Sequence, residues 1–116
     1  MTHRAVRMAA VAALFTLSRT LMAQSGYVTM SDSAKLYYRI VGRGADTIIA
    51  IHGGPGMDQE SIAGDFTPLT SKHTVIFYDQ RGGGRSTLPA DTSTLVAARQ
   101  IKDLSTSSAG IFASTA

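Results

Sequence analysis

Four short runs of apolar or alternating residues follow residue 23, and each predicts a β-strand. The first is rich in β-branched and aromatic residues, and the second alternates between apolar and polar positions, as a half-buried strand does. The other two are nearly continuous apolar runs, which are typical of strands buried on both faces of a parallel sheet. The four runs are residues 26–30, 35–41, 47–51 and 74–78.

Turn residues and capping residues between these runs predict how they are connected. The Ser31-Asp32-Ser33 turn predicts an antiparallel hairpin of the first two strands. Asp58 can cap a short helix, and Pro68 marks a break or the start of a second short turn. Residues 91–94 offer several N-caps for a helix over residues 95–104 with one apolar face. The order predicts an α/β fold, with an antiparallel hairpin followed by parallel strands and crossover helices.

The first 23 residues have the pattern of a secretory signal peptide. Arg4 and Arg7 supply positive charge, residues 8–17 form an apolar run, and the small residue Ala23 ends the segment. We expect Sec-type export to the periplasm or the medium, with cleavage after Ala23. A retained membrane anchor and a helix of the mature domain are the alternatives, and an uncleaved leader is the only membrane contact that the sequence predicts.

The net positive charge of the chain comes from the arginines of this leader. The whole sequence has a formal net charge of +3, and its three leader arginines account for all of it, so residues 24–116 are formally neutral. No basic cluster remains for nucleic acid. The absence of cysteine excludes disulfides and thiolate metal sites, and the spacing of His52 and His73 fits no zinc motif. We expect neither metal nor cofactor.

The first motif with chemical potential is His52-Gly53-Gly54-Pro55-Gly56, directly after a predicted strand. Glycine allows positive φ angles and brings backbone N–H groups close to a ligand. Because Pro55 lacks an N–H, Gly53 and Gly54 are the main candidate donors. The alternative is a tight turn without a binding role. For His52 we expect a supporting role, in which the ring braces the turn, rather than that of a general base.

The second motif runs from Asp79 through Gln-Arg-Gly-Gly-Gly-Arg to Ser86 and follows the next predicted strand. Asp79 can accept backbone N–H groups of the loop, Arg81 can pair with a carboxylate, and Ser86 can bond to the loop backbone. We expect these three residues to support a rigid loop beside a site rather than to contact a substrate. The glycines match neither phosphate-binding pattern, Gly-x-Gly-x-x-Gly or Gly-Lys-Ser/Thr.

Together the two motifs resemble those of the proline iminopeptidase group of α/β-hydrolases, which are serine aminopeptidases. The resemblance covers about residues 27–104. It implies the amino-terminal half of an α/β-hydrolase fold, in incomplete form, with Gly53 and Gly54 in the oxyanion hole. It also implies hydrolysis of amino-terminal peptide bonds, often of proline, in a peptide or small-molecule substrate and without a cofactor.

One departure from this family pattern leaves activity open. No Gly-x-Ser-x-Gly occurs in the 116 residues, and the acid and base of the catalytic triad would follow later in the family. We expect a leader at 1–23, a partial hydrolase domain at 24–104 and a divergent tail rich in Ser, Thr and Ala at 105–116. A truncated, frameshifted or partial sequence would give this pattern, and such a fragment would be inactive alone. The alternatives are a fragment of an esterase or epoxide hydrolase, or a non-functional remnant.

Overall fold

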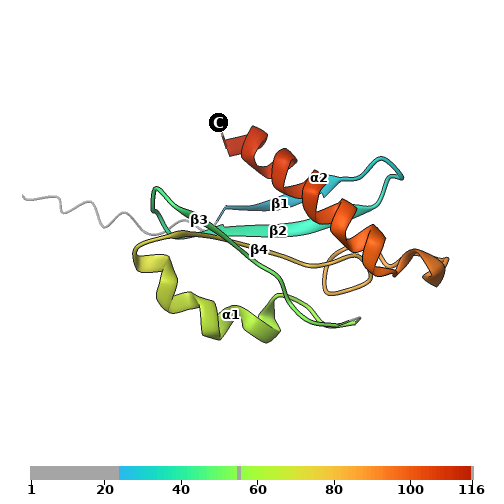
Figure 1. Cartoon of the computed structure of the whole chain (residues 1–116), viewed down its shortest axis with the longest axis horizontal. Coiled ribbons are helices and arrows are strands. Elements are labelled where there is room, and N and C mark those ends of the chain that lie inside the picture. The colour runs from blue at the N-terminus through green and yellow to red at the C-terminus, as the bar shows by residue number, and fades with distance from the viewer. Residues whose placement is uncertain (1–23, 55, 116) are drawn as a thin grey trace, which may run out of the picture.

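The computed structural model describes residues 24–54 and 56–115 and shows one mixed sheet with helices on both faces (Figure 1). The predicted signal peptide lies outside the described residues. The elements are β1 (Gln24–Thr29), β2 (Lys35–Val41), β3 (Thr47–Ala50), α1 (Glu60–Phe66), the 3₁₀ turn η1 (Thr67–Ser71), β4 (Thr74–Tyr78), the 3₁₀ turn η2 (Thr92–Thr94) and α2 (Ala97–Thr115).

The sheet has the strand order β1-β2-β4-β3. β1 and β2 form the predicted antiparallel hairpin, and β2 also pairs antiparallel with β4. β3 and β4 are parallel neighbours and are connected through α1 and η1. The prediction of a hairpin followed by parallel strands is therefore confirmed, and so is the α/β class.

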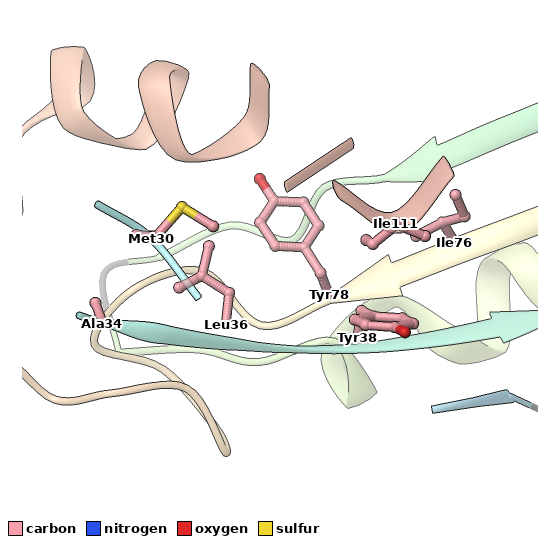
Figure 2. Close-up of a cluster of buried hydrophobic side chains, with 7 residues drawn as sticks. All are labelled: Met30, Ala34, Leu36, Tyr38, Ile76, Tyr78 and Ile111. Atoms are coloured by element: carbon pink, nitrogen blue, oxygen red, sulfur yellow. The ribbon is translucent and has the colours of Figure 1, made fainter. Parts of the chain in front are cut away.

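The two faces of the sheet are covered by different helices. On one face Val75 and Phe77 of β4 pack with residues of α1, including Phe66. The rings of Phe66 and Phe77 meet edge to face, with their centroids 6.3 Å apart. On the other face Ile76 and Tyr78 pack with β2 and with Ile111 of α2 (Figure 2). Because β4 is buried on both faces, its apolar run is continuous rather than alternating.

Helix α2 is longer than its sequence pattern predicts. The pattern ends at Leu104, whereas the helix continues to Thr115. The hydroxyl of Ser107 donates to the Leu104 carbonyl, so this small polar residue fits inside the helix. Gly110 lies against Val28 of β1, and Ile111 is 2% exposed. Packing against the sheet thus continues through this segment, and the division into domains at residue 104 stays a prediction.

In the part of the chain that the structure describes, no helix is both long and apolar enough to cross a membrane.

Candidate functional site

The two glycine-rich motifs lie next to each other because β3 and β4 are parallel neighbours. Each motif directly follows one of these strands, so both loops emerge at the same edge of the sheet. They border a cleft of about 350 Å³ together with the start of α2. The cleft is lined by residues of the two loops, including His52, Gly53, Gly54, Gln80, Arg81 and Gly83, and by Leu95, Gln100 and Ile101.

His52 is buried, and both of its ring nitrogens are engaged. The backbone N–H of Gln80 donates to His52 Nε2 at 2.9 Å. On the other side of the ring, Nδ1 lies 2.5 Å from the carbonyl oxygen of Gly53. No ring nitrogen is left to take a proton from a nucleophile in this arrangement.

Gly53 and Gly54 are exposed at the border of the cleft. Gly54 has a φ of +130°, which L side chains rarely adopt. Among residues 24–54 and 56–115, no hydrogen-bond acceptor is found for the backbone N–H of either glycine. The two N–H groups can therefore bind an external acceptor, and their role in an oxyanion hole stays a prediction.

The second loop approaches the first so closely that only glycine fits. A Cβ atom on Gly83 would lie 2.1 Å from the backbone oxygen of Met57. Part of the glycine content of this motif is thus explained by packing between the two loops.

Asp79 and Ser86 hold the second loop from within. The Asp79 carboxylate accepts the backbone N–H groups of Gln59 and Arg85, both at 2.9 Å. The Ser86 hydroxyl donates to the Asp79 carbonyl and accepts the backbone N–H of Tyr37. These bonds connect the loop to the start of α1 on one side and to β2 on the other.

Arg81 points away from solvent and binds two carboxylates. Its guanidinium makes two hydrogen bonds to Asp103 of α2, at 2.8 and 3.0 Å. It makes two more to Asp32 in the β1–β2 turn, at 2.7 and 3.1 Å. The side chains of Arg81 and Asp103 are each 2% exposed. One buried cation therefore joins the hairpin turn, the second loop and α2.

The ion pairs of Arg81, together with burial, shift the pKa values of three groups. The guanidinium of Arg81 lowers the pKa of Asp32 from 3.8 to about 2. Hydrogen bonds to Asp103 and Asp32 raise the pKa of Arg81 above its usual value. Burial, and then the nearby charge of Asp103, raises the pKa of the Tyr78 phenol to about 12. Asp32, Arg81 and Tyr78 therefore keep their ordinary ionisation states near neutral pH.

The sequence did not reveal three residues that the structure brings to the site. Asp32 and Asp103 lie 49 and 22 residues from Arg81, and no local pattern marks them as its partners. Gln80 stands within the second motif, but only the folded structure shows that it binds His52. No group of three or more His, Asp or Glu side chains in the described ranges is placed to hold a metal ion.

Sequence comparison finds proline iminopeptidases among the relatives of this chain. The enzyme of Lactiplantibacillus plantarum is 35% identical over 72 residues, which are 59% of this chain and 25% of that protein. The enzyme of Heyndrickxia coagulans is 31% identical over 84 residues, which are 72% of this chain and 29% of that protein. The chain thus spans about a quarter of the length of the curated relatives it matches. No protein-family model matches the sequence.

Solved structures give the same assignment of the fold. A proline iminopeptidase-related protein from Thermus thermophilus aligns with a TM-score of 0.63 and 30% identity, over 71% of this chain and 30% of that one. An esterase from Exiguobacterium antarcticum aligns with a TM-score of 0.67 and 19% identity, over 76% and 32%. An epoxide hydrolase from Vigna radiata aligns with a TM-score of 0.63 and 20% identity, over 72% and 27%. The described residues thus have part of an α/β-hydrolase fold, and the chain is similar in sequence to proline iminopeptidases.

Proposed function

We propose that this chain supplies backbone N–H groups that stabilise negative charge in the active site of an exported hydrolase of the proline iminopeptidase type. The observation that carries the proposal is the position of the Gly53 and Gly54 N–H groups. Both glycines follow the carboxyl end of β3 and border the cleft, and the ring of buried His52 bonds to the carbonyl of Gly53. The likeness to proline iminopeptidases supports amino-terminal peptide bonds as the substrate class.

The role of these N–H groups follows from the chemistry of acyl transfer. Attack on a peptide carbonyl places negative charge on its oxygen, and a backbone N–H aimed at that oxygen lowers the barrier. One such donor contributes about 2.7–4 kcal/mol at the transition state. The donors act only after a nucleophile has attacked. Since the 116 residues contain no Gly-x-Ser-x-Gly, we propose that the chain by itself does not turn over a substrate.

A second candidate function is the same charge stabilisation by these N–H groups in an esterase or an epoxide hydrolase. Solved structures of both classes share the fold of this chain. Their identities to it are lower than that of the Thermus thermophilus protein, so proline iminopeptidase is the first choice.

A chimera tests the proposal in a complete active site. Residues 27–104 of this chain replace the matching segment of the Lactiplantibacillus plantarum proline iminopeptidase. Hydrolysis of a prolyl anilide, an aryl acetate ester and an epoxide is then compared. We expect hydrolysis of the prolyl anilide. Preferential turnover of the ester or the epoxide would favour the second candidate, and an inactive but folded chimera would contradict the proposed role.

Matched variants locate the effect in the loop. Gly54→Pro removes the N–H of a residue with positive φ and is expected to reduce kcat about 100-fold or more. Gly64→Ala is the control, because nothing lies within 4 Å of the added Cβ. The unmodified 116-residue chain is expected to remain unlabelled by a fluorophosphonate, and stoichiometric labelling would contradict its inactivity.

A further inference from the structure

Two consecutive peptide groups of the first loop are each held through their carbonyl oxygen. The side-chain amide of Gln80 donates to the carbonyl of His52. The His52 ring in turn bonds to the carbonyl of Gly53 through Nδ1. The second motif therefore reaches the first loop through one residue, Gln80, which lies at the cleft border.

The contacts of His52 define which tautomer the ring adopts. The Gln80 backbone can only donate, so His52 Nε2 must accept and cannot carry a proton. The proton of the neutral ring then sits on Nδ1, from which it is donated to the Gly53 carbonyl. A ring with its proton on Nε2 would direct two donors at each other and leave the contact between Nδ1 and the Gly53 carbonyl without a hydrogen.

Because peptide groups are planar, these two carbonyl contacts also determine where the N–H groups of Gly53 and Gly54 point. The bonds between described residues are all trans, and in a trans peptide the C=O and the following N–H point in opposite directions. The N–H of Gly53 therefore points away from the Gln80 amide. The N–H of Gly54 points away from the buried imidazole, toward the exposed side of the loop.

We propose that Gln80 and the Nδ1-protonated form of His52 are the positioning residues that aim the Gly53 and Gly54 N–H groups at a substrate oxyanion. The inference rests on the proposed function of the loop. It also gives the Asp-Gln-Arg-Gly motif a specific role, because its glutamine orients donors that belong to the other motif. Gln80 suits this role because its backbone and its side chain both donate to His52.

The first experiment determines the tautomer of the His52 ring in the active chimera. Long-range ¹H–¹⁵N NMR of ¹⁵N-labelled protein distinguishes a protonated from an unprotonated ring nitrogen. We expect the His52 signals of the Nδ1-protonated tautomer, identified by their loss in His52→Asn. A folded chimera with the proton on Nε2 would overturn the inference and leave the proposed hydrolase function untouched.

The second experiment measures kinetics in the same chimera. Gln80→Glu nearly preserves size but replaces the donor amide with an acceptor. We expect it to lower kcat about 100-fold with little change in KM, because an aimed oxyanion donor acts in the transition state. Ser71→Asp is the control, because it also adds one negative charge, at an exposed position of η1 outside the cleft.

Comparison of a conservative variant of His52 with its truncation to alanine completes the test. Asn can place an amide N–H near the position of Nδ1, so His52→Asn is expected to recover part of the kcat that His52→Ala loses. Equal effects of Gln80→Glu and Ser71→Asp, or an equal loss of kcat in His52→Asn and His52→Ala, would overturn the positioning role. An unmodified chimera that is folded but inactive would instead contradict the proposed function.

Discussion

Arg81 and Asp103 form a two-point ion pair between the second glycine loop and helix α2, although 22 residues separate them in the sequence. The same guanidinium binds Asp32 of the hairpin turn through its remaining donors. Two carboxylates thus share one cation beneath the loop that orients His52. A buried pair of this kind adds little net stability when it is intact, but removal of one partner strongly lowers the free energy of unfolding.

The first prediction concerns Asp103. Asp103→Asn removes the buried one of the two carboxylates that pair with the Arg81 guanidinium, which is 2% exposed. We expect the free energy of unfolding to fall by about 3 kcal/mol or more, measured by urea denaturation. Asp65→Asn on the exposed side of α1 is the control and should change it by less than about 0.5 kcal/mol. Equal effects of the two variants would show that the ion pair is not a structural requirement.

The second prediction concerns acid sensitivity. The pKa of Asp32 is lowered to about 2 by the hydrogen bonds from Arg81. A lowered pKa means that the contribution of Asp32 to stability is fully present above its unfolded value near 4 and is lost as the pH falls toward 2. Thermal unfolding between pH 5 and 2 should therefore depend more steeply on pH in the unmodified chain than in Asp32→Asn. Parallel profiles would contradict this assignment.

The third prediction concerns export. If residues 1–23 act as a Sec signal, amino-terminal sequencing of protein from outside the cytoplasm should begin at Gln24 or within two residues of it. Leu14→Arg places a charge in the apolar run and should keep the chain in the cytoplasm with its leader intact. Recovery of intact Met1 in the exported fraction would argue for a retained anchor instead.

The fourth prediction concerns association of the isolated chain. β3 lies at one edge of the described sheet, and large apolar side chains such as Ile51 and Ile101 are 49% and 68% exposed. Open strand edges and exposed apolar surface promote association. We expect sedimentation velocity to show oligomers or aggregates, which Ile101→Lys reduces. Ser61→Lys on α1 adds the same charge at an exposed position and should not reduce them.

Local pattern was sufficient to predict the strands but not the full length of α2. β2 and β4 have the predicted bounds because alternation and continuous apolar character are local signals of burial. The segment after Leu104 has few large apolar residues, and its Ile111 is buried against the sheet. Tertiary contacts of this kind have no signature in the segment itself.

The candidate site was predictable to a similar extent. The sequence placed each loop directly after a predicted strand and gave Gly53 and Gly54 as candidate donors, and that role stays a prediction. It could not identify the partners of Arg81, because Asp32 and Asp103 approach it only through the hairpin and α2. It also could not show that Gln80 bonds to the first loop, since that contact requires β3 and β4 to be adjacent.

The shared cation has a consequence for the order in which the chain is made. Synthesis proceeds from the amino terminus, so Asp32 and Arg81 leave the ribosome before Asp103 does. Protease sensitivity of ribosome-bound chains that end before or after α2 would report whether the second loop tightens at that step. The loop that borders the cleft is therefore expected to reach its final rigidity late, when a helix synthesised after it supplies the second carboxylate.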